Sequence, residues 1–86
     1  MALVRVRGPL KQKAGGQSEL AIEGATVGEL MNELERANPD MRGWVLDERG
    51  HIRRHINVFV NGELGTDATA VGDDDRIDVL PAISGG

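Results

Sequence analysis

The sequence predicts an α+β domain in which one main helix packs on one face of a mixed sheet of four to five strands. Apolar and polar residues alternate in segments near both ends and in the second half of the chain, which is typical of half-buried strands. One segment in the first half instead has an apolar stripe at helical spacing. Because this helix separates the opening strands from the later ones, the first and last strands can pair in parallel, and we expect them side by side in the centre of the sheet.

Two alternating segments open the chain. Val4 and Val6 mark the first expected strand, in which the intervening arginines form a solvated face, and Leu20 and Ile22 mark the second. Between them, the segment 11–17 contains two consecutive glycines and is expected to be a loop. The chain should therefore begin with a hairpin.

The clearest local signal is a capping box at Thr26. The Thr26 hydroxyl should accept a hydrogen bond from the third backbone N–H of a helix, while Glu29 reaches back toward the cap. An apolar stripe at helical spacing follows, made of Val27, Leu30, Met31 and Leu34. Pro39 requires the helix to end at or before Asn38, so we predict a helix over 27–37.

The segment after the helix has a weaker pattern. We expect Trp44 and Leu46 to cover the core from a short turn or 3₁₀ segment, and 47–50 to form a turn. The strongest strand follows, with apolar residues at alternate positions from 56 to 60. Asn61-Gly62 closes this strand and favours a type I′ turn.

The remaining residues return to the sheet. We expect a short strand or an irregular crossing over 62–71 and an acidic turn over 72–75. Ile77 and Val79 then alternate with polar and exposed positions in a last strand. Pro81 cannot donate a hydrogen bond to a neighbouring strand, so this strand should end there. We therefore divide the chain into a domain, 1–81, and a free C-terminal tail, 82–86.

Composition excludes several classes of function. The chain has 86 residues, which is one small domain, and a net charge of −4, which argues against binding nucleic acid. It has no cysteine, so disulfides, thiolate metal sites and a persulfide on this chain are excluded. No apolar stretch is long enough to cross a membrane and the N-terminus does not have the pattern of a signal peptide. We expect a cytoplasmic protein without a membrane partner.

The sequence ends in Ser84-Gly85-Gly86. A terminal pair of glycines presents a free carboxylate on a strip without side chains, and such a strip can enter a slot too narrow for any Cβ. A frayed chain end is the alternative explanation of the same residues. The two glycines by themselves therefore do not indicate a function, and the rest of the chain must show whether this end is used.

The whole chain resembles the ubiquitin-like sulfur carriers, which have the β-grasp fold. The segments that carry the resemblance are Val58 to Glu63, the Gly72-Asp73-Asp74 turn, and Leu80-Pro81-Ala82-Ile83-Ser84-Gly85-Gly86. This family includes the small subunit of molybdopterin synthase, the thiamine sulfur carrier and the carrier of the thiocarboxylate route to cysteine. Length favours the molybdopterin-synthase and cysteine-type carriers, because the thiamine carriers are shorter, and the segment 50–60 looks closest to the cysteine-type branch. The tail has Ile-Ser-Gly-Gly where many relatives have Val-Ala-Gly-Gly.

The resemblance implies a carrier and not an enzyme. A partner resembling the ubiquitin-activating enzymes would adenylate the Gly86 carboxylate with ATP, and a sulfur donor would displace AMP to leave a thiocarboxylate. A sulfur-accepting synthase would then use that sulfur to make cysteine or another sulfur-containing metabolite. This chain has no phosphate-binding glycine loop of its own, so ATP must be bound by the partner. The site residues implied are Gly86 as the reactive end and Ala82, Ile83, Ser84 and Gly85 as the tail.

Strand alternation also predicts a docking surface for these partners. Phe59 and Leu80 should point away from the helix and form an apolar patch on neighbouring strands, leading to Ile83. We group Pro81, at the start of the tail, with this partner-binding surface. Isolated exposed apolar residues are common on protein surfaces, but an aromatic residue and a leucine beside the tail favour docking.

Two other groups of residues have side chains that can bind metal ions. His51 and His55 have the spacing of a metal pair on a helix, but a glycine precedes them and a strand pattern follows, so a solvated loop is favoured. The acidic run 73–75 lacks the spacing of a calcium loop, and an acidic turn is favoured. No metal site is predicted.

Two other functions remain open. The first is a ubiquitin-like protein modifier, joined to target lysines through the same carboxylate; Lys11 and Lys13 are the only lysines of this chain. The second is an interaction module whose tail is inert. Within the carrier family, the small subunit of molybdopterin synthase is the alternative to the cysteine-type carrier.

Overall fold

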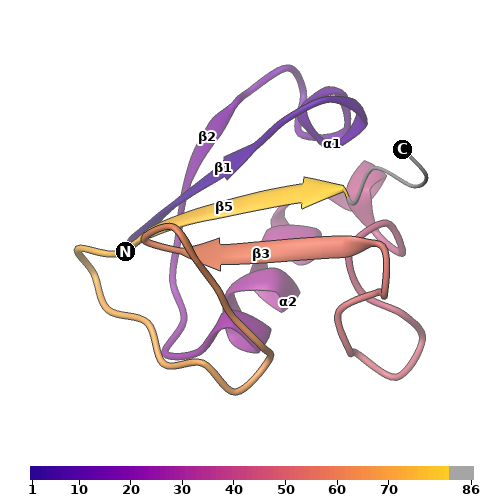
Figure 1. Ribbon diagram of the computed structural model, residues 1–86. Helices are drawn as coiled ribbons and strands as arrows, with labels where there is room; N and C mark the ends of the chain where they lie inside the picture. Colours follow the sequence, from indigo (N-terminus) through magenta and orange to yellow (C-terminus); the bar gives the residue numbers. More distant parts are fainter. Residues whose placement is uncertain (82–86) are drawn as a thin grey trace.

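A five-stranded mixed sheet with one main helix on one face forms the domain. The computed structural model describes residues 1–81. The sheet has the order β2-β1-β5-β3-β4, and β1 and β5 are parallel neighbours in its centre. This is the predicted α+β, β-grasp arrangement (Figure 1). The strands and helices are β1 (Ala2–Val6), α1 (Pro9–Lys13), β2 (Glu19–Ile22), α2 (Val27–Ala37), the 3₁₀ helix η1 (Pro39–Met41), β3 (Ile56–Val60), β4 (Glu63–Leu64) and β5 (Arg76–Pro81).

The expected loop at 11–17 is partly wrong, because α1 occupies its beginning. Pro9 stands in the first turn of α1, where its fixed φ suits a helix and its missing N–H costs nothing. Leu10 is buried in the core, which gives this short helix the tertiary contact that it needs. Gly15 and Gly16, at φ values of 70° and 87°, then turn the chain toward β2.

The main helix begins and ends where the sequence predicts. Glu29 donates its backbone N–H to the Thr26 hydroxyl at 3.2 Å, and the Glu29 carboxylate accepts from the backbone N–H of Ala25 at 2.9 Å. The first two N–H groups of α2 bind carbonyls of the crossing segment, from Val27 to Thr69 and from Gly28 to Asp67. The crossing segment thereby fixes the N-terminus of α2 against the sheet.

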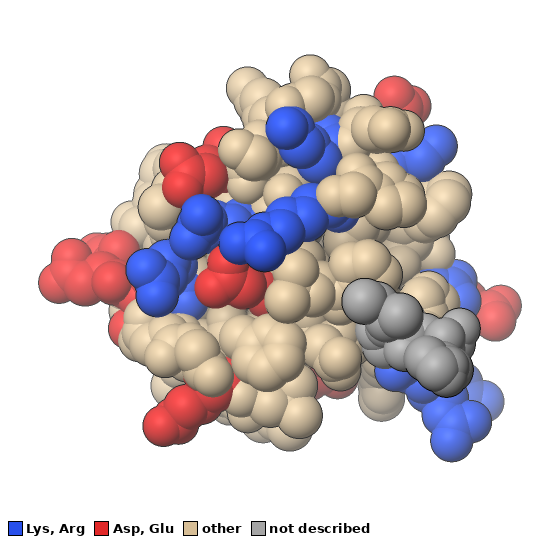
Figure 2. Space-filling model, turned by 45° about the horizontal axis from the view of Figure 1, so that its top comes forward, with Lys and Arg blue, Asp and Glu red and all other residues tan. Residues whose placement is uncertain are grey.

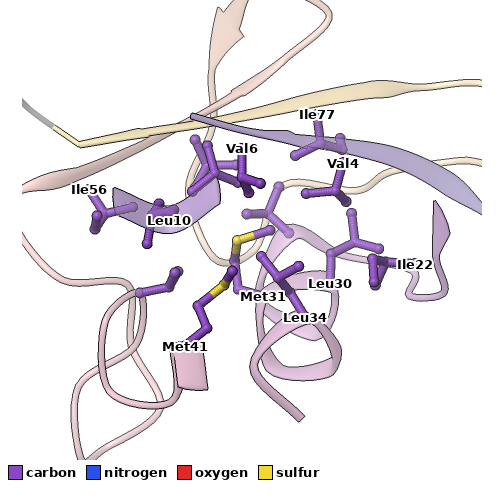
Figure 3. Packing of buried hydrophobic residues seen from close by; sticks show 14 of the residues in the cluster. Val4, Val6, Leu10, Ile22, Leu30, Met31, Leu34, Met41, Ile56 and Ile77 are labelled. Atoms are coloured by element: carbon purple, nitrogen blue, oxygen red, sulfur yellow. The ribbon is translucent and has the colours of Figure 1, made fainter. Parts of the chain in front are cut away.

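The core lies between α2 and the inner face of the sheet (Figure 3). The helical stripe is fully buried against inward residues of β1, β3 and β5, and Leu10 and Met41 extend the core beyond one end of the helix. This core is aliphatic, as expected from a sequence with one tryptophan and one phenylalanine. Its members from the strands include Val4, Val6, Val58, Ile77 and Val79.

The prediction that Trp44 covers the core is wrong, whereas the one for Leu46 is correct. Trp44 is 44% exposed, and its neighbour Val45 is buried. The reason lies in the buried carboxylate of Glu35, which accepts hydrogen bonds from the backbone N–H groups of Gly43, Val45 and Leu46. These bonds fix the backbone so that Val45 points inward and Trp44 outward, where the Lys13 ammonium lies 4.9 Å from the centre of its ring.

The second hairpin has the predicted turn. Asn61 and Gly62 both have positive φ, 52° and 88°, and they connect β3 to β4 as a two-residue loop, as type I′ requires. The crossing over 62–71 contains the short strand β4, and the acidic segment before β5 is a turn. Within residues 1–81, no helix is long and apolar enough to cross a membrane.

Candidate functional site

The central strand β5 delivers the chain to its C-terminal tail. Between its two neighbours, β5 pairs with β1 from Arg76 to Val79 and with β3 from Ile77 to Pro81, which lies opposite Ile56. The five residues predicted to form the working tail, Ala82 to Gly86, lie outside the described residues. The described structure ends at Pro81, where β5 still pairs with β3 but no longer with β1.

The open face of the sheet brings Phe59 and Leu80 together, as the alternation predicts. Both line one shallow hollow of about 290 Å³, and both are half-buried. The pairing register sets them diagonally on adjacent strands, since Phe59 lies opposite Asp78 and Leu80 opposite Asn57. We call the hollow lined by Arg5, Arg7, Phe59, Gly62, Asp78 and Leu80 the open-face hollow.

The charges around this hollow were not singled out from the sequence. One row crosses the sheet from Glu19 through Arg5 and Asp78 to Phe59. The Arg5 guanidinium lies 3.5 Å from the Glu19 carboxylate and 3.9 Å from that of Asp78. Figure 2 shows Lys and Arg side chains gathered in a band across this face, although the chain as a whole is acidic. The alternation of Arg5 and Arg7 with buried valines is the signal that could have revealed this basic border.

Pro81 does not join Phe59 and Leu80. It lines a separate small notch of about 70 Å³ at the end of β5, whose walls are almost entirely apolar. We call this hollow the Trp44 notch; it is lined by Pro9, Leu10, Trp44, His55, Ile56 and Pro81. Its components come from four separate parts of the chain, so sequence spacing gave no sign of it.

Two turns at the opposite end of the sheet hold β3 and β5 in register. The Asn61 side chain donates to the Asp75 carboxylate at 2.8 Å and accepts from the Arg76 backbone N–H at 2.9 Å. Asp75 also accepts from the backbone N–H of Gly72 at 2.8 Å. The Gly72 and Asn61 hydrogen bonds lower the pKa of Asp75 below its ordinary 3.8, because they stabilise the charged form.

His51 and the acidic turn over 73–75 line neither hollow, whereas His55 lines the Trp44 notch. His51 and His55 are exposed in the segment between the 47–50 turn and β3. Within residues 1–81, no three or more of His, Asp and Glu are grouped so as to hold a metal ion. Asp75 serves the turn itself, and Asp73 lies 3.1 Å from the N-terminal amine.

The sequence is similar to those of known proteins. A protein-family model described as the ThiS family matches residues 4–86. The chain is 32% identical to the sulfur carrier protein CysO of Mycobacterium tuberculosis, with 90% of this chain and 89% of that protein covered. It is 36% identical to the small archaeal modifier protein 1 of Haloferax volcanii, with 90% and 91% covered.

A solved structure extends the likeness to three dimensions. A chain in the crystal structure of the BexX/CysO complex from Amycolatopsis orientalis superposes with a TM-score of 0.87 at 30% sequence identity, and both chains are fully covered. The likeness therefore extends to the fold of the whole domain.

Proposed function

Because the chain belongs to the ThiS family of ubiquitin-like sulfur carriers, which are carriers and not catalysts, we propose that it carries sulfur as a thiocarboxylate on Gly86. The observation that carries this proposal is the family match, which runs through the tail to residue 86. The central position of β5 adds a physical reason, since its pairing with β1 up to Val79 and with β3 up to Pro81 gives the tail a fixed base.

The proposed chemistry has two steps on the terminal carboxylate. In an adenylating partner, a carboxylate oxygen of Gly86 attacks the α-phosphorus of ATP, which forms an acyl adenylate and releases pyrophosphate. Sulfide then attacks the acyl carbon and expels AMP, which carries the original oxygen away. The product is a thiocarboxylate, and no oxidation state of carbon changes.

The residues of this chain indicate which steps it can perform and which steps need a partner. Its sequence has no phosphate-binding glycine loop and no cysteine, so ATP binding and sulfur activation belong to partners. We propose an adenylating enzyme resembling the ubiquitin-activating enzymes, followed by a sulfur-accepting synthase. Gly85 and Gly86 let the tail enter a slot that would exclude a Cβ.

We propose that both partners dock on the open-face hollow. Phe59 on β3 and Leu80 on β5 supply an apolar surface, and the positive charges of Arg5 and Arg7 border it. Arg5 is shared between two carboxylates, whereas Arg7 is exposed and forms no ion pair within residues 1–81. A partner with an apolar centre and an acidic border would match this surface.

For the acceptor, we propose biosynthesis of cysteine or of another sulfur-containing metabolite. The support is the 32% identity to a protein named sulfur carrier protein CysO over most of both chains. The small subunit of molybdopterin synthase is the alternative within the family. The thiocarboxylate form is incubated separately with a cysteine-synthase-type enzyme and with a large molybdopterin synthase subunit, each together with its electrophilic co-substrate. Only the true acceptor should consume the thiocarboxylate, by bonding its sulfur to the co-substrate, which changes the intact mass of the chain.

Intact mass spectrometry tests the carrier function. The chain is incubated with the activating enzyme from the same cell, ATP and sulfide, and we expect a mass gain equal to the exchange of one oxygen for sulfur. Deletion of Gly86 should abolish the gain while the melting temperature stays almost unchanged. No mass change with any activating enzyme of that cell would contradict the proposal.

A protein modifier is the second candidate, because the chain is 36% identical to a protein named small archaeal modifier protein 1. The same incubation, with a cell extract added, distinguishes the two functions. Conjugation would appear as a covalent adduct between Gly86 and a lysine of another protein, and this adduct would resist thiols. Of the two lysines of this chain, Lys13 is engaged with Trp44, which leaves Lys11 as the more accessible internal acceptor.

A further inference from the structure

The chain keeps its one tryptophan and its one phenylalanine out of the core. The core is aliphatic, and neither Trp44 nor Phe59 is among its members. Phe59 lines the open-face hollow, whereas Trp44, which is 44% exposed, lines the Trp44 notch. Aromatic side chains at the centre of an interface contribute strongly to binding. Two hollows with one aromatic wall each therefore indicate two points of contact with a partner.

The two hollows lie on opposite sides of the last residues of β5. Ile77 and Val79 are buried on the inner side of the sheet, whereas Leu80 lines the open-face hollow. Successive residues of a strand point to opposite faces, and Pro81 accordingly lines the Trp44 notch instead. A protein that covers the end of β5 can contact both residues, so the notch continues the docking surface proposed above.

The notch is a preformed site for one apolar side chain. It has a volume of about 70 Å³, and His55 is the only polar residue among those that line it. A buried water typically needs two to four polar partners, so the notch suits an aliphatic group better than water. Trp44 is held in place, because the Glu35 carboxylate binds the backbone on both sides of it and the Lys13 ammonium lies 4.9 Å from the centre of its ring. A fixed wall lowers the entropy that binding costs.

The surface around the notch is basic although the chain as a whole is acidic. Five of the six lining residues come from the segments 9–13 and 42–56. These segments contain six Lys and Arg against two Asp and Glu, a net charge of +4, whereas the whole chain has −4. None of these six cations forms an ion pair within residues 1–81. Carboxylates of a partner would complement this border.

We propose that the Trp44 notch receives one aliphatic side chain from an acidic segment of the adenylating partner. This inference rests on the proposed function, because it assigns the notch to the protein that acts on Gly86. The five residues after Pro81 span at most about 18 Å, so that protein works at this end of the sheet. A second copy of the chain is disfavoured, because a two-fold contact would bring two basic borders together.

Fluorine NMR tests the occupancy of the notch in the full-length chain. The single tryptophan gives a single resonance when it is replaced by 5-fluorotryptophan. Unlabelled adenylating enzyme is then added without ATP or sulfide. We expect the resonance to shift or broaden with the same Kd that calorimetry measures for the complex.

Two pairs of variants separate the apolar contact from the charge. Trp44→Ala should raise Kd by about tenfold, whereas Leu3→Ala should leave it almost unchanged, because Leu3 is 39% exposed and lines neither hollow. Arg54→Gln removes an exposed charge beside His55 and should raise Kd at low salt more than at high salt. Arg36→Gln removes the same charge from α2, outside the two basic segments, and should have the smaller effect.

Three results would overturn the proposal. The first is an unchanged fluorine resonance in the presence of excess enzyme. The second is a resonance that shifts with the concentration of the labelled chain alone, which would assign the notch to a second copy. The third is a shift caused by vesicles of phosphatidylcholine and phosphatidylserine but not by the enzyme, which would assign the notch to a membrane surface.

The mass gain on Gly86 is measured separately, so the two proposals fail in different ways. An unchanged resonance together with a mass gain contradicts only the role of the notch. A shifted resonance without a mass gain contradicts only the carrier function.

Discussion

Asn61 donates a hydrogen bond of 2.8 Å to Asp75, fourteen residues further along the chain, and so joins the β3–β4 turn to the turn that precedes β5. Asn61 also binds the backbone of Arg76 through both its side chain and its main chain, at 2.9 Å and 2.8 Å. These bonds fix β3 against β5 at one end. The register that they set places Phe59 opposite Asp78 and next to Leu80.

Replacing Asn61 with alanine should lower the free energy of unfolding by roughly 1–2 kcal/mol. Alanine is less tolerant of the positive φ of 52° at this position and cannot accept the hydrogen bond of the Arg76 N–H. Urea unfolding measures the change. The matched variant Asn61→Gly keeps the backbone conformation accessible and removes only the hydrogen bonds, so it should fall between the wild type and Asn61→Ala in stability. Equal stability of all three would show that the turns do not hold the register.

Stability should decrease in acid because two carboxylates are hydrogen-bonded in the folded state. The backbone N–H of His51, followed by that of Arg49, lowers the pKa of Asp47, and Gly72 and Asn61 lower that of Asp75, both from 3.8. A lowered folded pKa stabilises the protein above the unfolded value of 3.8, and this contribution is lost as the pH falls through the folded value.

The pH dependence is checked by urea unfolding at several pH values above and below 3.8. Asp47→Asn should show a smaller loss of stability in acid than the wild type, because its side chain no longer takes up a proton. Asp40→Asn is the control, since the exposed Asp40 makes no side-chain hydrogen bond within residues 1–81. An identical acid response of wild type and Asp47→Asn would contradict the assignment.

Glu35 should be the polar residue of α2 whose replacement destabilises the fold most. Its carboxylate accepts hydrogen bonds at 3.2, 3.0 and 2.9 Å from three backbone N–H groups, and its side chain is buried. Glu35→Ala leaves these donors without a partner and should cost about 3 kcal/mol or more. Glu35→Gln keeps one acceptor oxygen and should cost less.

The matched control for Glu35 is Glu33→Ala on the same helix. Glu33 is about half exposed and forms a surface ion pair of 3.4 Å with Arg36, so its loss should cost at most about 0.5 kcal/mol. Chemical unfolding of the three variants measures the differences. If Glu35→Ala were as mild as Glu33→Ala, the hydrogen bonds to the 43–46 segment would not stabilise the fold.

Phe59→Ala should reduce kcat/KM of the activating enzyme for this carrier by about tenfold or more, which is typical for loss of a central aromatic contact. The melting temperature should change little, since Phe59 is only half-buried on the open face. Leu64→Ala is the comparison: Leu64 lies opposite Phe59 on the edge strand β4 and is 66% exposed, but it does not line the open-face hollow. A greater effect of Leu64→Ala would move the docking centre to the sheet edge.

Arg7→Ala should slow association with an acidic partner, and the loss should shrink as salt is added. The matched control is Arg42→Ala, because Arg42 is equally exposed but lies beside η1, away from the open-face hollow. Stopped-flow association rates at low and high ionic strength measure the effect. Equal rates for the two variants at low salt would contradict a role for the basic border.

The sequence by itself determined the order of the main strands and the main helix, because the local signals there are strong and independent of distant residues. The capping box at Thr26, the helical stripe and the Asn61-Gly62 turn each depend on residues within a few positions of one another, and alternation assigned Phe59 and Leu80 to the open face. The family resemblance supplied the role proposed for Gly86.

Features that depend on contacts between distant parts of the chain were visible only in the tertiary structure. The short helix α1 exists because Leu10 is buried by elements far along the chain, so a run with loop composition is helical there. Trp44 points outward because the carboxylate of Glu35, on α2, accepts hydrogen bonds from the backbone N–H groups on either side of it. The Trp44 notch and the row from Glu19 to Phe59 are built from separate strands and loops, and spacing along one chain carries no information about which residues the fold brings together.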